Sequence, residues 1–332
     1  MLESSKTVQK RVARTSQRVM VGLVAAAALT GLGMQTASAQ ATRPKAPIYG
    51  VTLDDVSSIN AIVASLTHLP YKPTVRVVFD PGTSAADYYA PLVKLHQVAY
   101  VMGEVMDSYY FPVDSATYSA RTNELVSTLK NVVDVWEIAN EINGEWLRDN
   151  PSGPTTTATS QEQAIGQMVG NAYDIVKGAG GLVSVTMYYN DDGKGTNCYE
   201  LPMDSWRTWA TNFLPARVRQ GADYALFSYY PYQDCPGLSP TWTSDFKLLE
   251  SIFPVAKVGF GEIGTSSTSA PSSVQQNLIK SYYPMGTTQM AADPRFIGGY
   301  FWWNYVEQML PYSSSSYWSL LNNTIKPLAA PQ

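Results

Sequence analysis

The chain has few of the residues on which several large enzyme classes depend. It contains two histidines, His68 and His96, and both fall in segments with a helical pattern. A Ser-His-Asp hydrolase or a zinc enzyme with histidine ligands would need a histidine near a strand tip. The sequence therefore argues against both classes. A nucleotide-binding sheet is also disfavoured, because Leu53-Asp54-Asp55 stand where a Gly-rich phosphate loop would follow the first strand.

Cysteine is equally scarce, and the two residues present are Cys198 and Cys235. Each follows a strand-like run by several residues, so both are expected in loops on the same face of the fold. In an oxidising compartment two cysteines allow a single pairing. The sequence predicts one disulfide between these loops. The alternative is two free thiols.

Long apolar runs are absent except near the beginning of the chain. Basic residues including Lys6 and Arg18 precede an apolar run over 19–34, and Ala37-Ser38-Ala39 follow it. This order is typical of a secretory signal peptide, predicted here as residues 1–39. The alternative is a membrane anchor, for which the run is short. The predicted location of the mature chain, 40–332, is secreted or periplasmic.

Positive charge is also in short supply once that segment is removed. The formal charge of -4 becomes about -8, because residues 1–39 hold five basic residues and one acidic residue. Such an acidic chain argues against nucleic acid or an anionic membrane surface as a partner. An uncharged substrate is compatible with it. We expect residues 40–332 to form a single domain and a monomer.

Eight strand-like segments alternate with helix-like segments along this domain. The strands are expected at 48–53, 74–79, 99–106, the beginning of 133–146, 182–188, 224–229, 257–260 and 296–303, and the helices near 57–69, 84–96, 115–129, 160–177, 203–218, 244–252, 272–283 and 314–322. Repeated strand–helix units without hairpins are typical of a parallel sheet. The predicted fold is therefore α/β, a closed (β/α)8 TIM barrel.

The stretch 133–146 carries the most specific motif. Its Trp136-Glu137-Ile138 and Asn140-Glu141, with Asn143-Gly144 after them, resemble the acid/base strand of glycoside hydrolase clan A, and of family 5 in particular. In a TIM barrel, catalytic groups stand at the carboxyl ends of strands. The resemblance implies that Glu141 is a general acid/base.

A second glutamate, Glu262, ends the seventh predicted strand, and its surroundings resemble the nucleophile strand of the same clan. The resemblance of the pair implies an enzyme that cleaves β-glycosidic bonds within a polysaccharide with retention, through a covalent glycosyl-enzyme, and the predicted signal peptide implies that it is secreted. No metal or organic cofactor is implied. The alternative for either glutamate is an ordinary surface carboxylate at a strand end.

Two further residues match positions of the clan. Arg76, inside the apolar second strand, corresponds to the arginine below the nucleophile, where a cation favours ionised Glu262. Its alternative is a structural ion pair with Asp54, Asp80 or Glu137. Asn140 corresponds to the asparagine that binds the sugar 2-hydroxyl.

Aromatic residues at two strand ends also match the clan. Tyr232 fits the tyrosine after the sixth strand, and Tyr230 stands where histidine is expected. Trp302 or Trp303 corresponds to the tryptophan platform under the sugar, and Trp302 is preferred. The clan's helper histidines are missing, which departs from the family 5 pattern.

Two other functions fit the same residues. One is an exo-acting β-glycosidase of the same clan, which differs in the length of its products. The other is a non-catalytic polysaccharide-binding barrel, which would bind without turnover. The presence of both glutamates disfavours it.

Overall fold

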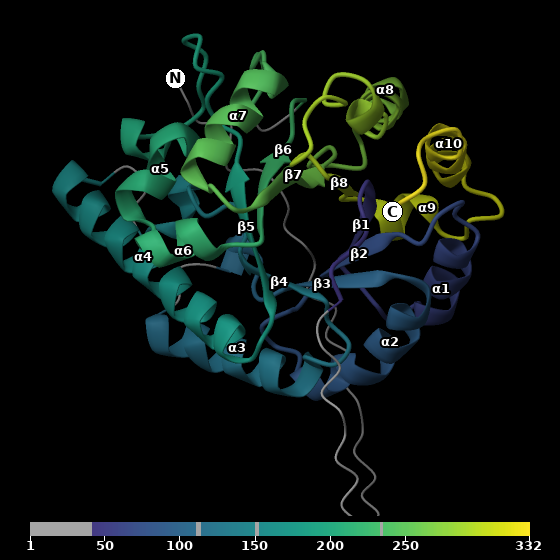
Figure 1. Ribbon diagram of the computed structural model, residues 1–332, viewed down its shortest axis with the longest axis horizontal. Coiled ribbons are helices and arrows are strands. Elements are labelled where there is room, and N and C mark those ends of the chain that lie inside the picture. The colour runs from purple at the N-terminus through teal and green to yellow at the C-terminus, as the bar shows by residue number, and fades with distance from the viewer. Residues whose placement is uncertain (1–41, 111–113, 150–152, 233–234) are drawn as a thin grey trace, which may run out of the picture. The chain divides into compact units, whose positions relative to one another are not determined.

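Parallel strands form the centre of the structure, a computed structural model that describes residues 42–110, 114–149, 153–232 and 235–332. Within these residues, eight strands close into a barrel in the order β1-β2-β3-β4-β5-β6-β7-β8 (Figure 1). They are β1 Ile48–Leu53, β2 Thr74–Val78, β3 Tyr100–Glu104, β4 Val135–Ala139, β5 Leu182–Tyr188, β6 Tyr224–Tyr229, β7 Lys257–Ile263 and β8 Gly298–Trp302. The predicted (β/α)8 TIM barrel is confirmed.

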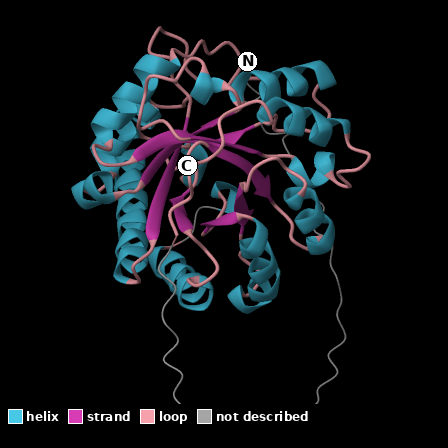
Figure 2. Cartoon of the chain, turned by 45° about the vertical axis from the view of Figure 1, so that its right-hand side comes forward, coloured by secondary structure: helices cyan, strands magenta, loops and turns pink. Residues whose placement is uncertain are grey.

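Helices surround the strands, as Figure 2 shows for the magenta sheet and its cyan neighbours. They are α1 Ile59–Thr67, α2 Ala85–Val98, α3 Ser115–Leu129, α4 Thr155–Gly178, α5 Trp206–Phe213, α6 Ala216–Gly221, α7 Trp242–Ile252, α8 Ser272–Tyr282, α9 Tyr305–Met309 and α10 Ser316–Ile325, with short 3-10 turns η1 Ser108–Tyr110, η2 Glu145–Leu147, η3 Pro202–Asp204 and η4 Met285–Thr287. The main apolar core lies between this helical layer and the barrel.

The strands are apolar along almost their whole length because both of their faces are covered. All five residues of β2 and all six of β1 and β6 are buried. Near-continuous runs of this kind are expected when helices cover the outside of a parallel sheet and side chains fill its inside. This pattern made the strands recognisable in the sequence.

The inside of the barrel is divided between apolar and polar side chains. A separate apolar cluster, mostly from residues at or near the amino ends of the strands, is formed by Ile48, Met102, Val135, Tyr224, Leu226, Ile297 and Phe301. Further along the strands, the buried side chains include Arg76, Glu104, Glu137 and Thr186. The apolar cluster closes one end of the barrel, and the polar residues approach the end at which parallel strands present functional groups.

The sequence placed most elements within a few residues, and the differences have physical reasons. The single helix expected over 203–218 is two helices, α5 and α6, separated by Leu214-Pro215. Proline disfavours the helical conformation of the residue before it, and Leu214 is indeed extended. The short helix α9 was not predicted, because five residues are too few for a periodic pattern.

The predicted signal peptide, residues 1–39, lies outside the described residues. None of the helices in the described residues combines the length and the apolar character that crossing a membrane requires.

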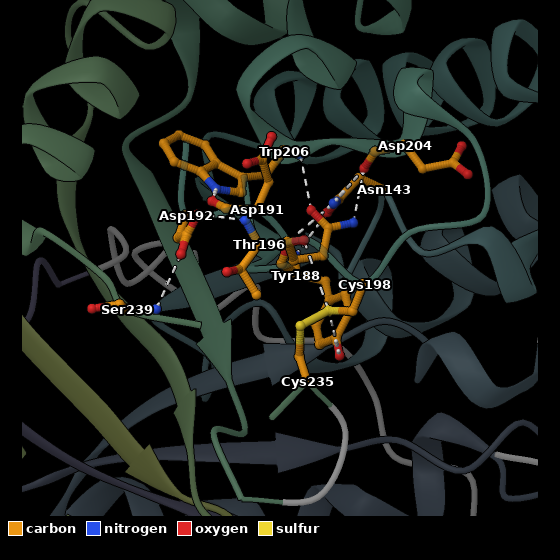
Figure 3. Close-up of a disulfide and its surroundings, with 11 residues drawn as sticks. Asn143, Tyr188, Asp191, Asp192, Thr196, Cys198, Asp204, Trp206, Cys235 and Ser239 are labelled. Atoms are coloured by element: carbon orange, nitrogen blue, oxygen red, sulfur yellow. Dashed lines mark hydrogen bonds between the residues drawn. A yellow bond between two sulfur atoms is a disulfide. The ribbon is translucent and has the colours of Figure 1, made fainter. Parts of the chain in front are cut away.

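The predicted disulfide between Cys198 and Cys235 is present. It joins the loop after β5 to the loop after β6, next to Tyr188, whose hydroxyl lies 3.9 Å from Cys198 Sγ (Figure 3). The two cysteines are 37 residues apart in sequence. Closing a loop of this length in the unfolded chain contributes about 3–4 kcal/mol in the loop-entropy model.

Replacing both cysteines, Cys198→Ser with Cys235→Ser, is therefore expected to lower the free energy of unfolding by about 3–4 kcal/mol. Urea denaturation of the two proteins measures the difference. Reductant should destabilise the wild type to a similar extent and leave the double variant unchanged. Equal urea midpoints for the two proteins would show that the crosslink does not stabilise the barrel.

Candidate active site

A single buried arginine stands at the centre of the site. Arg76 lies in the middle of β2, between two valines, and its side chain is fully buried. Its Nε is 2.5 Å from Glu137 Oε2, and its Nη2 is 3.0 Å from Glu104 Oε2 and 2.7 Å from Glu262 Oε1. The planar guanidinium can serve several acceptors at once because its donors point in fixed, divergent directions. Arg76 thus pairs with Glu137 as well as with Glu262.

The three carboxylates outnumber the one cation that faces them. Their side chains are between 0 and 5% exposed. Burial raises the pKa of Glu104 well above its usual range, against the opposing charge of Arg76. Burial likewise raises the pKa of Glu262 to about 7, while Arg76 and the hydrogen bond from Tyr230 oppose the rise. Burial thus raises the pKa of all three carboxyls, Glu137 included, and the charge of Arg76 lowers it.

Glu262 stands near the carboxyl end of β7, where the sequence placed it. Besides Arg76, it accepts a hydrogen bond from Asn140 Nδ2 at 2.7 Å and one from the hydroxyl of Tyr230. Asn140 and Tyr230 directly follow the ends of β4 and β6, which meet at one face because the strands are parallel, and Arg76 reaches Glu262 from the middle of β2. Three donors around one carboxylate favour its ionised form.

Glu141 lies two residues beyond the end of β4, at the same face of the barrel. Its backbone has a φ of 46°, in the left-handed region that residues other than glycine seldom adopt. Such strained positions cluster at functional sites, where the surrounding structure enforces them. Its carboxylate accepts hydrogen bonds from Ser108 Oγ at 3.2 Å and from Ser228 Oγ at 2.6 Å.

Asn140 connects the surroundings of the two glutamates. Its side-chain oxygen accepts a hydrogen bond from the backbone N–H of Ser108 at 3.2 Å, and its Nδ2 donates to Glu262. Since Ser108 also contacts Glu141, a continuous series of hydrogen bonds runs from one glutamate to the other. The structure thus brings Glu141, Glu262, Arg76 and Asn140 together, as the sequence motif suggested.

The two tyrosines after β6 differ in their surroundings. Strand β6 ends at Tyr229, so Tyr230 is the first residue beyond it, and its hydroxyl donates to Glu262. Tyr232 lies in the turn that follows and is 41% exposed. Of the two tyrosines, Tyr230 is thus the one that contacts Glu262.

The preference for Trp302 over Trp303 is also corrected. Trp302 is fully buried, and its Nε1 donates to Gln308 at 3.1 Å. Trp303 is partly exposed, and its ring centroid lies 5.7 Å from Cζ of Arg76. Trp303 is thus the indole that lies next to Arg76, which pairs with Glu262.

An irregularity of β8 explains this correction. Gly299 pairs with Tyr49 and Trp302 pairs with Val51, so β8 contains one residue more than β1 between these pairs. Positive φ angles run from Gly298 through Phe301. One inserted residue exchanges the directions of all side chains that follow it. A count along the sequence cannot show this.

Several residues of the site were not singled out in the sequence. They are Glu104, Thr186, which donates to Glu137, and the serines Ser108 and Ser228. Glu104 had a usable signal, since it is a carboxylate at the end of an apolar strand, much like Glu262. Serines next to aromatic residues carry no comparable signal. Among the described residues, no group of three or more His, Cys, Asp or Glu side chains could hold a metal ion.

Comparison with known proteins supports the fold. Neither protein-family models nor curated protein sequences match this chain. Among solved structures, a beta-glucuronidase from Bacteroides uniformis has a TM-score of 0.52 at 11% identity, covering 78% of this chain and 30% of that one. A glycoside hydrolase family 5 enzyme from Prevotella bryantii B14 has a TM-score of 0.51 at 11% identity, covering 91% of this chain and 99% of that one.

The AHE enzyme from Alicyclobacillus herbarius has a TM-score of 0.52 at 12% identity, covering 75% of this chain and 76% of that one. The chain thus spans less than a third of the glucuronidase and nearly all of the family 5 enzyme. At these identities the similarity is one of fold. The resemblance to family 5 that the motif around Glu141 suggested is confirmed at that level.

Removing the central cation tests how the buried carboxylates are stabilised. Arg76→Met is expected to lower the free energy of unfolding by about 3–5 kcal/mol at pH 8, because it leaves buried carboxylates without their partner. Without Arg76, the pKa of these buried carboxyls is higher in the folded protein than in the unfolded chain. A rise in pH therefore favours the unfolded chain. The loss should therefore be smaller at pH 5 than at pH 8.

Urea denaturation at both pH values measures this difference. Arg217→Met is the matched control, because Arg217 pairs with Asp174 on the surface, where the two side chains are 43% and 53% exposed. It should cost less than about 1 kcal/mol at either pH. An Arg76→Met variant that is equally destabilised at both pH values would contradict the assigned charge balance.

Proposed function

We propose that the chain is a secreted, retaining glycoside hydrolase of clan A that cleaves β-glycosidic bonds within a polysaccharide. The observation that carries the proposal is the placement of Glu141 and Glu262 at one face of the barrel, joined through Asn140, with Arg76 2.7 Å from Glu262. The likeness of the barrel to a family 5 enzyme supports it.

In this proposal Glu262 is the nucleophile. Its ionised carboxylate attacks the anomeric carbon, the glycosidic bond breaks, and a glycosyl ester forms. Arg76, Asn140 and Tyr230 hold its two oxygens in one orientation. A carboxylate fixed in this way loses little freedom when it reacts.

Glu141 is the general acid/base. In the first step it donates its proton to the leaving oxygen, and in the second it takes a proton from the water that cleaves the ester. Of the two glutamates, Glu141 is the more exposed, as a residue that serves both the leaving group and water requires. Neither step calls for a metal or an organic cofactor.

Exposed aromatic residues support a carbohydrate polymer as the substrate. Tyr109 and Tyr110 follow β3 directly after Ser108, which contacts Glu141, and they are 67% and 40% exposed. Tyr232, after β6, is 41% exposed. Aromatic faces pack on the apolar faces of sugar rings. An enzyme that binds several sugar rings on either side of the cleaved bond is suited to cleavage within a polysaccharide chain.

A panel of polysaccharides tests the activity directly. Wild type should release oligosaccharides from one of them, whereas Glu262→Gln and Glu141→Gln should each lose at least about a thousandfold in kcat/KM, since each removes a group required for bond cleavage. Glu307→Gln, which changes an exposed glutamate of α9, is the matched control and should keep full activity. Binding without any cleavage by wild type would instead indicate the non-catalytic barrel.

Rescue by azide separates the roles of the two glutamates. With an activated aryl β-glycoside, Glu141→Ala should still form the glycosyl ester, and azide should then release a β-glycosyl azide. Glu262→Ala lacks the nucleophile, so azide should attack directly and give the α-glycosyl azide. NMR of the product distinguishes the two. The opposite outcome for the two variants would exchange the assigned roles.

The pH dependence of kcat/KM tests the ionisation of Glu262. Burial raises its pKa to about 7, and only the ionised form attacks. As pH falls below about 7 the ionised fraction decreases, so kcat/KM should decrease about tenfold per pH unit. Initial rates at low substrate concentration between pH 4 and 9 measure this. Undiminished activity at pH 5 would contradict it.

A further inference from the structure

Both oxygens of Glu141 are held by serine hydroxyls. Ser228 Oγ donates to Oε1 at 2.6 Å, and Ser108 Oγ donates to Oε2 at 3.2 Å. Neither serine is exposed by more than 3%. A buried hydroxyl needs a hydrogen-bond partner. The Glu141 carboxylate is such a partner for both Ser108 and Ser228.

The two serines come from different parts of the barrel, and each is fixed by its own backbone. Ser228 is in β6, where it lies opposite Glu262 in the pairing of β6 with β7. Ser108 begins η1 after β3, and its N–H donates to Asn140. Glu141, whose backbone is left-handed, is therefore held from two sides by side-chain hydrogen bonds.

We propose that Ser108 and Ser228 are positioning residues that orient the acid/base Glu141 and set the pH at which it loses its proton. The inference rests on the proposed function in assigning that role to Glu141. The residues act through Glu141, and nothing in the inference requires them to contact the substrate.

The chemistry of the hydroxyl group suits this task. A hydroxyl that donates to an ionised carboxylate makes a charge-assisted hydrogen bond, which is about twice as strong as a neutral one. Two such bonds favour the ionised form of Glu141. A hydroxyl can also rotate and accept, so the same serines can serve the protonated carboxyl. The two serines stay uncharged whether Glu141 is protonated or ionised.

Other titratable groups surround Glu141 and Glu262, and the test must allow for them. They are Arg76 from β2, Glu104 from β3, Asp107 from the loop after β3, Glu137 from β4, Tyr230 after β6 and Glu262 from β7. Tyr230 feels the charges of both Glu141 and Glu262. Removing a neutral serine hydroxyl leaves all of these charges in place, so a change in titration is due to the lost hydrogen bond.

The test is a titration of Glu141 in protein labelled with ¹³C at glutamate side-chain carboxyls, followed by NMR and assigned with Glu141→Gln. Ser228→Ala and Ser108→Ala should each move the midpoint upward by about one pH unit, because each removes a donor to the ionised form. Ser228→Thr keeps a hydroxyl and should restore the wild-type midpoint. The basic limb of kcat/KM should move in parallel.

Ser184→Ala is the matched control, because Ser184 is a fully buried serine of β5 that lies opposite the first residue of β6. It should leave the midpoint unchanged. Wild-type midpoints in both Ser→Ala variants, or an equal shift in Ser184→Ala, would overturn the inference. The NMR readout requires no turnover. If the protein cleaves no polysaccharide, the proposed function is wrong, but the titration still tests whether the two serines set the midpoint of Glu141.

Discussion

The ion pairs of Arg76 are the interaction on which the rest of the structure depends. A guanidinium inside a barrel is costly unless carboxylates satisfy it, and three carboxylates are costly unless a cation accompanies them. The arginine and the glutamates of β3, β4 and β7 therefore fix one another. Because these strands are distant in sequence, the network ties the closure of the barrel to the arrangement of the site. The same ion pairs therefore stabilise the barrel and hold the candidate catalytic residues in place.

The sequence was sufficient to predict the fold, and it placed Glu141 and Glu262 at the face of the barrel where the structure has them. The apolar strands and the regular alternation predicted the barrel, since strands buried on both faces leave a clear pattern. The motif around Glu141 and the strand ending in Glu262 located the pair, because parallel strands place their carboxyl ends at one face. Arg76 was singled out because, within an apolar strand, it matches the arginine that clan A has below its nucleophile.

The sequence was insufficient where a side chain's direction depends on backbone irregularity. The choice between Trp302 and Trp303 depended on the extra residue in β8, and the contact of Tyr230 with Glu262 depends on where β6 ends. The serines around Glu141 could not be identified, because small polar residues are common and their partners are distant in sequence. These contacts arise from tertiary packing and leave no local pattern.

The irregular segment of β8 has a consequence for how such sites diverge. Four successive residues, Gly298 through Phe301, have left-handed backbone angles, and they precede the two adjacent tryptophans. Because one residue decides which indole lies next to Arg76, the insertion or deletion of a single codon here would exchange a buried tryptophan for an accessible one. Among relatives of this chain, the position of an alignment gap in this segment is thus expected to go together with which of the two indoles is accessible.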